Sequence, residues 1–132
     1  MEQRSHFTTT VLWITAFYYL ACGLSAIFYP VSWLFLSGLP TTVSNELGLA
    51  FGVAGVYLLT MAFAATLAAL NPREHRSVIL ILVAGNVLDF AVTLNAVVAQ
   101  SLPFINGALF IVVTVGFALS LFYAYLQARL AH

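Results

Sequence analysis

Asp89 is the residue that most readily suggests chemistry, because it stands inside a long apolar stretch of the chain. Asn86, Thr93 and Gln100 fall on the same side of a helix as Asp89, since successive helical residues turn by about 100°. In a helix that spans a membrane, a carboxyl near the centre costs about 2.5–3.5 kcal/mol on insertion scales. That cost predicts either a hydrogen-bonded network or a water-filled cavity around Asp89.

Neighbouring segments supply the other members of the expected network. Folding them back as hairpins puts Tyr57 level with Asn86 and Thr114 near the level of Asp89, while Tyr18 lies at middling depth in the first segment. No Arg or Lys lies at this depth, so water or a cationic ligand would be the partner of the Asp89 charge. Two interpretations stay open for Asp89: a ligand-binding group, or a hydrogen-bonded packing residue.

The polar face is lopsided, since it runs from Asn86 toward Gln100 and not toward the basic residues that precede it. A cavity on this face would open on the non-cytoplasmic side, with Glu46 near its rim. Glu46 also has a simpler explanation, because acids in the first turn of a helix complement its dipole. The candidate ligand-binding residues are Asp89, Asn86, Tyr57, Thr93, Gln100, Glu46, Tyr18 and Thr114.

Other chemistry finds little support in the residue types and spacings. His6, His75 and His132 lie outside the apolar segments and never at the spacing of paired helical ligands, and Cys22 is the one cysteine. Glu46 would lie about 12 Å along the axis from the level of Asp89, too far for one reacting centre. We therefore predict no catalytic residue, no metal site and no cofactor.

The composition decides which kind of protein must position these residues. Of 132 residues, 63% are hydrophobic and 6% are charged, against about 45–50% and about 25% in soluble domains. So few charges cannot cover a water-facing surface, and they cannot form the basic patch of a nucleic-acid-binding protein. The chain is therefore expected to be an integral membrane protein, in contact with lipid.

Four segments are long enough to cross the roughly 30 Å hydrocarbon core, which takes about 20 apolar residues. We expect an all-α, four-helix bundle in a single domain, 1–132, because no segment shows the alternating polarity of a barrel strand. The run 31–36 is too short to span and, with its Trp33, is expected to lie in the interface. The predicted spans are 8–29, 44–70, 72–99 and 102–130.

The third segment has a recognisable helix start. Asn71 is placed to cap it, with Pro72 in the first helical position and Glu74 as the capping-box partner. The second and third helices would then form a tight antiparallel hairpin.

The basic residues indicate the orientation. Arg4, Arg73, Arg76 and Arg129 lie in regions that an even number of spans places on one side, and the loops on the other side contain no Lys or Arg. The positive-inside rule therefore predicts that both termini are cytoplasmic.

Small residues offer two candidate seams for a homo-oligomer, because close backbone approach drives helix association in lipid. The two sets are Gly48, Gly52 and Gly55, and Gly116, Ser120 and Ala124. Packing inside one bundle is the preferred interpretation for the first set, since a central helix needs close neighbours in any case.

Several short motifs follow one another in a characteristic order: Pro30, the Gly38-Leu39-Pro40 turn, Glu46 with Gly48, the segments 55–59 and 71–76, and Asp89. This order resembles that of the DoxX-like proteins, small four-helix bacterial membrane proteins of unknown function. The resemblance implies a tetraspan fold in the bacterial cytoplasmic membrane. No redox ligand is found, unlike in the oxidoreductase-associated members.

Three functions follow in order of preference. The first is binding or transport of a lipophilic or weakly cationic small molecule in a cavity around Asp89. The second is a non-catalytic subunit or assembly factor of a larger membrane complex, with the small-residue stripes as docking faces. The third is an intramembrane enzyme, which would need Glu46 and Asp89 within reach of one ligand atom.

Overall fold

The computed structural model describes residues 2–42 and 44–130, and these form five helices and no strand. The all-α prediction is therefore confirmed. Four helices are long and apolar enough to cross a membrane, so the chain has the architecture of a small tetraspan membrane protein. The helices are α1 (Glu2–Phe28), α2 (Pro30–Leu36), α3 (Asn45–Leu70), α4 (Arg76–Val98) and α5 (Phe104–Leu130).

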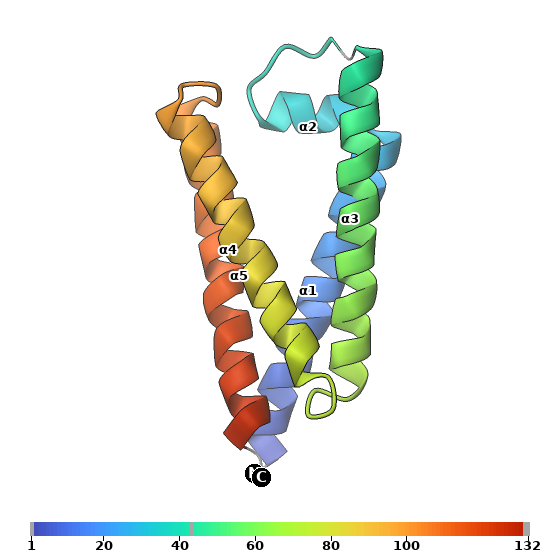
Figure 1. Ribbon diagram of the computed structural model, residues 1–132, viewed down its shortest axis with the longest axis vertical. Helices are drawn as coiled ribbons and strands as arrows, with labels where there is room; N and C mark the ends of the chain where they lie inside the picture. Colours follow the sequence, from blue (N-terminus) through green and yellow to red (C-terminus); the bar gives the residue numbers. More distant parts are fainter. Residues whose placement is uncertain (1, 43, 131–132) are drawn as a thin grey trace.

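The four long helices are arranged as two pairs. α1 packs along α3, and α4 packs along α5, whereas α3 and α4 contact each other over only a short part of their length. The pairs meet at one end and diverge toward the other, so that the molecule resembles a V (Figure 1). The tight hairpin expected from α3 and α4 is therefore wrong: a short turn connects them, but each finds its main neighbour elsewhere.

Glycines explain why α1 and α3 stay together. A Cβ on Gly55 would lie 2.9 Å from the carbonyl oxygen of Gly23, and a Cβ on Gly23 would lie 3.0 Å from that of Gly55. Only two glycines facing each other allow this approach, which supplies the close contact that lipid cannot drive. Gly55 is thus used inside the bundle.

Of the other small residues in the two candidate seams, some are buried within the bundle and some lie on its outer surface. Ala124 is fully buried within the bundle, whereas a Cβ on Gly52 or on Gly116 would have no heavy atom within 4 Å. Gly52 and Gly116 remain available for contact between copies, and the homo-oligomer remains a prediction.

The two pairs join through a core of small and aliphatic side chains at the closed end. Ala65 and Ala68 of α3 are fully buried against Ile79 and Leu82 of α4 and Leu121 of α5. The alanines let the backbones approach, and the larger residues fill the space between them. Toward the other end α3 and α4 separate.

The chain reversal between α3 and α4 differs from the predicted helix start. α4 begins at Arg76 with His75 as its N-cap, and the segment 72–75 forms a turn. The Asn71 side chain donates a 2.7 Å hydrogen bond to the Glu74 carboxylate within this turn. The predicted capping box is therefore wrong, because both side chains brace the turn and neither caps the helix.

The short helix α2 crosses the V at its wide end (Figure 1). Trp33 donates from Nε1 to the Ser25 hydroxyl of α1 at 3.0 Å, and its ring stacks on Phe110 of α5 with centroids 6.3 Å apart. Asn106 of α5 donates to the Leu36 carbonyl at 2.6 Å. α2 therefore ties the two pairs together where they are farthest apart.

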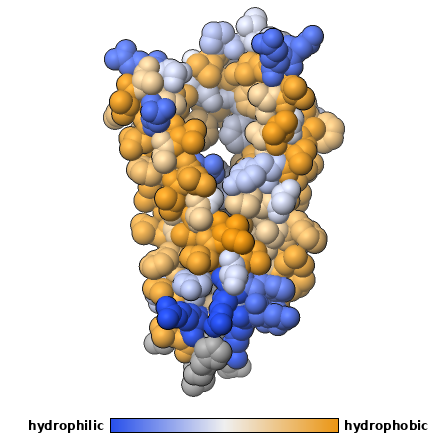
Figure 2. All heavy atoms as spheres, in the orientation of Figure 1, coloured by the Kyte–Doolittle hydropathy of each residue, from blue (hydrophilic) through white to orange (hydrophobic). Residues whose placement is uncertain are grey.

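The two ends of the molecule differ in charge. The start of α1, the end of α5 and the 71–75 turn lie at the closed end, where hydrophilic side chains gather (Figures 1 and 2). Arg73, Arg76 and Arg129 belong to this end, which we call the basic end. The opposite end, with α2 and the 99–103 turn, is called the open end; the cytoplasmic placement of the basic end remains a prediction.

Candidate functional site

The divergence of the two pairs leaves a hollow on the α3/α4 face of the molecule, in the half nearer the open end (Figure 2). We call this hollow the cleft. Its floor is the point where α4 leaves α3, and polar side chains of three helices meet there. The cleft is therefore the place where the polar face of α4 meets the rest of the bundle.

Asn86 forms the floor of the cleft. Its side chain is 2% exposed, and its amide nitrogen donates to the Tyr19 hydroxyl at 2.7 Å and to the Leu82 carbonyl at 2.9 Å. Tyr19 is itself 2% exposed. A buried amide in lipid needs such partners, because each unsatisfied polar group there is costly. Asn86 and Tyr19 thus anchor α4 to α1.

Asp89 lies one turn beyond Asn86 toward the open end, about 20 Å along α4 from Arg76 at 1.5 Å per residue. Among the described residues, its carboxylate has no hydrogen-bond or ion-pair partner. All buried side-chain polar atoms of this part of the chain do have partners. The half-buried Asp89 is therefore unpaired among the described residues and is not sealed in the core.

Three tyrosines interact with this carboxylate. The hydroxyls of Tyr18 and Tyr19 on α1 and of Tyr57 on α3 are all close enough to interact with it electrostatically. Tyr57 reaches across to α4 because residue 85 is glycine, where a Cβ would lie 3.1 Å from the Tyr57 oxygen. Asp89 thus has tyrosine side chains of the opposite pair in its neighbourhood.

Tyr18 also forms part of the wall on the α1/α5 side. Its ring packs on Phe117 of α5 with centroids 4.6 Å apart, and its hydroxyl contacts the Cys22 thiol one turn along α1. The ring contact between Tyr18 and Phe117 joins α1 of one pair to α5 of the other.

The structure places the other candidate residues away from this centre. Thr93 is partly buried one turn beyond Asp89 on α4. Thr114 donates to its own helix, to the carbonyls of Phe110 at 3.0 Å and Ile111 at 3.1 Å, and so does not join the network. Glu46, in the first turn of α3, and Gln100, in the turn after α4, are exposed at the open end.

The two carboxyls considered as an acid and base pair are not brought together. Glu46 stands at the start of α3 and Asp89 near the middle of α4, and these helices separate toward the end where Glu46 lies (Figure 1). Nor do any three His, Cys, Asp or Glu side chains of the described residues gather closely enough to hold a metal ion.

Tyr19 is the site residue that sequence reasoning missed, because Tyr18 was preferred to it. A signal was available: Leu12, Thr15, Ala16 and Tyr19 recur at helical spacing, and all four are buried. Tyr19 continues that buried face toward α4, whereas Tyr18 is turned toward α5.

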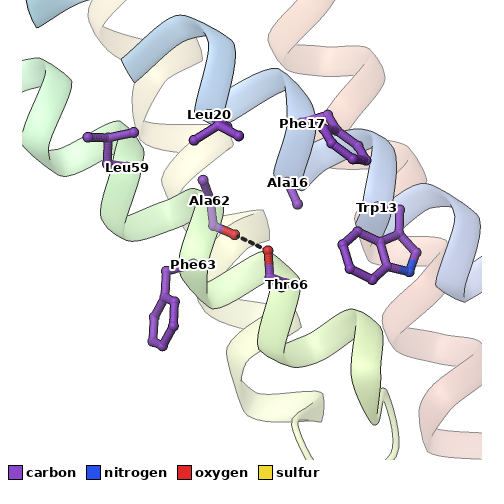
Figure 3. A pocket seen from close by; sticks show the side chains of 8 residues that line it. All are labelled: Trp13, Ala16, Phe17, Leu20, Leu59, Ala62, Phe63 and Thr66. Atoms are coloured by element: carbon purple, nitrogen blue, oxygen red, sulfur yellow. Dashed lines mark hydrogen bonds between the residues drawn. The ribbon is translucent and has the colours of Figure 1, made fainter. Parts of the chain in front are cut away.

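A second hollow lies outside the bundle, between α1 and α3 (Figure 3). This groove encloses about 300 Å³, and its Thr66 hydroxyl is already used in a 2.9 Å hydrogen bond to the Ala62 carbonyl. Apart from the Trp13 indole N–H, the groove offers only apolar contact, and it contains no charged group, so the cleft is the better candidate site. The groove is lined by Trp13, Ala16, Phe17, Leu20, Leu59, Ala62, Phe63 and Thr66.

Comparisons of the chain with protein-family models, curated proteins and solved structures found no match. The four apolar helices are compatible with a tetraspan membrane protein. The function must therefore be argued from the cleft.

Proposed function

We propose that the protein binds or transports a lipophilic, weakly cationic small molecule, which is held in the cleft against Asp89. The observation that carries this proposal is a half-buried mid-helix carboxylate that has no partner among the described residues and belongs to a helix that borders the hollow. Intramembrane carboxylates are costly and mark ligand or ion pathways when no basic residue pairs with them. A cationic ligand would supply the missing partner.

The aromatic surroundings support a cation over other ligands. A cation positioned over a tyrosine ring gains about 0.5–2 kcal/mol in addition to its charge pairing. Tyr18 and Tyr57 both interact electrostatically with Asp89, so a cation bound to the carboxylate would have aromatic rings close by. No described arginine lies in the middle of a helix to compete for the carboxylate.

The cellular setting belongs to the same proposal. A basic end that faces the cytoplasm would turn the cleft toward the non-cytoplasmic side of a bacterial cytoplasmic membrane, as the resemblance to DoxX-like proteins implies.

Binding of radiolabelled tetraphenylphosphonium to the purified protein in lipid nanodiscs tests the proposal. Asp89→Asn should weaken binding by about tenfold or more, equivalent to about 1.4 kcal/mol. Glu46→Gln is the matched control, since it removes an equal charge from the exposed start of α3. Its affinity should stay within about twofold of the parent.

Stability must be measured on the same samples. An Asp89→Asn protein that unfolds more readily but binds the probe unchanged would identify Asp89 as a packing residue and overturn the proposal. Co-purification with unrelated membrane proteins and no probe binding would instead favour a subunit of a larger complex.

A further inference from the structure

The cleft is bordered by side-chain contacts on its α1/α5 side and at the open end, but not between α3 and α4. This difference indicates how a ligand would reach it. On the α1/α5 side, Tyr18 packs on Phe117 at 4.6 Å, and nearer the open end Trp33 bridges Ser25 and Phe110. Aromatic contacts therefore connect the two pairs along the back of the cleft.

The open end is crossed as well. α2 lies across it, held to α5 by the hydrogen bond from Asn106 to the Leu36 carbonyl and to α1 through the Trp33 indole. A glycine completes the turn after α2: Gly38 adopts φ 69°, and a Cβ there would lie 3.0 Å from the Asn106 side chain. The route along the bundle axis from the water at this end is thus obstructed by a docked helix.

Between Tyr57 and Gly85 and the open end, α3 and α4 are not connected by an aromatic contact or a side-chain hydrogen bond among the described residues. Ala54 and Ala50 continue the Tyr57 face of α3 toward the open end, and both are exposed. On α4, Val92 continues the Gly85 face and is 69% exposed. Between these faces runs a slot, visible as the hollow on the near side of Figure 2.

The slot is apolar and opens sideways, and both helices that border it are candidate membrane spans. In a bilayer the slot therefore faces acyl chains and leads inward to Asp89. A molecule that uses it must first partition into the membrane and must also carry a group that pairs with a carboxylate.

We infer that the cleft is loaded from the membrane through the slot between α3 and α4, and that its ligand is an amphiphilic organic cation dissolved in the bilayer. The inference rests on the proposed function and adds a route and a chemical class to it. The alkyl part of the ligand would stay between Ala54 and Val92 while its cationic head reaches Asp89.

Two radiolabelled probes with the same permanently charged head test the route: N-methylpyridinium, which stays in water, and N-decylpyridinium, which enters the bilayer. Both are measured on nanodiscs that contain the full chain, and the signal from Asp89→Asn nanodiscs is subtracted as the membrane background. The decyl probe should half-saturate the Asp89-dependent signal at a concentration about tenfold or more below the methyl probe, because its chain is buried.

A bulky side chain in the slot provides the second arm. Ala54→Trp should slow association of the decyl probe about tenfold, whereas Val56→Trp, on the opposite side of α3, should leave it within about twofold. Val92→Trp narrows the slot from the α4 side and should act like Ala54→Trp. This second variant keeps the test valid if the first one fails to fold.

The outcomes separate the two proposals. Equal half-saturation by the two probes, with no effect of Ala54→Trp or Val92→Trp, would overturn the lateral route and leave ligand binding at Asp89 intact. A signal that Asp89→Asn does not change for either probe would overturn both.

Discussion

Asn86 of α4 donates a 2.7 Å hydrogen bond to the Tyr19 hydroxyl of α1, and both side chains are almost fully buried. The bond joins helices of different pairs at the point where α4 begins to lean away from α3. Asn86 lies one helical turn from Asp89. The hydrogen bond therefore also positions the part of α4 that carries Asp89. The position of the Asp89 carboxylate, which has no partner among the described residues, thus depends on the neighbouring hydrogen bond between Asn86 and Tyr19.

Removing this bond should destabilise the fold by a modest amount. Tyr19→Phe and Asn86→Leu each delete one partner, and their coupling in a double-mutant cycle should be about 0.6–1.7 kcal/mol, the range for hydrogen bonds between membrane helices. Unfolding by titration with a denaturing detergent measures it. Tyr123→Phe, which removes the hydroxyl of an exposed tyrosine, serves as control; a coupling near zero would show that the bond holds nothing together.

The glycine contact between α1 and α3 should tolerate no side chain. Gly55→Ala puts a methyl group 2.9 Å from the Gly23 carbonyl oxygen, and the backbone must shift, at a cost of about 1–3 kcal/mol. Gly52→Ala, three residues away with open space around it, should be neutral or stabilising by up to about 1 kcal/mol. Thermal unfolding compares the two, and equal effects would contradict the close approach described here.

The docking of α2 should depend on Asn106. Asn106→Leu removes the donor to the Leu36 carbonyl, so residues 30–36 should open more often and exchange amide hydrogens about fivefold faster, as expected for one lost hydrogen bond of about 1 kcal/mol. Hydrogen exchange followed by mass spectrometry measures this. Ser101→Ala removes a hydroxyl that bonds only the Ala96 carbonyl in the adjacent turn, and it should leave α2 unchanged.

The orientation in the membrane can be measured independently of any ligand. In a Cys22→Ala background, a cysteine at Thr41 should react with a membrane-impermeant maleimide in intact cells, and a cysteine at Glu74 should react only after permeabilisation. The reason is the positive-inside rule, which assigns the end with Arg73 and Arg76 to the cytoplasm. The reverse labelling pattern would place the cleft on the cytoplasmic side.

The candidate site could be predicted in part, because its polar residues stand out against an apolar chain. Asp89 and Asn86 lie on one helix, and the level of Tyr57 beside Asn86 follows from the short turn between their segments. Which of Tyr18 and Tyr19 faces α4 was harder to predict. Adjacent helical residues point in directions about 100° apart, and the packing of the neighbouring helices decides which direction is inward.

The number of long helices and their apolar character follow from the order of residues alone, because about 20 apolar residues are needed to cross a bilayer and these runs lack the alternating polarity of barrel strands. How the helices pair is visible only in the folded molecule. Pairing depends on side-chain shape at particular crossings, such as Gly23 against Gly55, and hydrophobicity does not distinguish one apolar face from another in lipid. α3 therefore lies along α1 and not along α4, and that choice opens the cleft in which Asp89 stands.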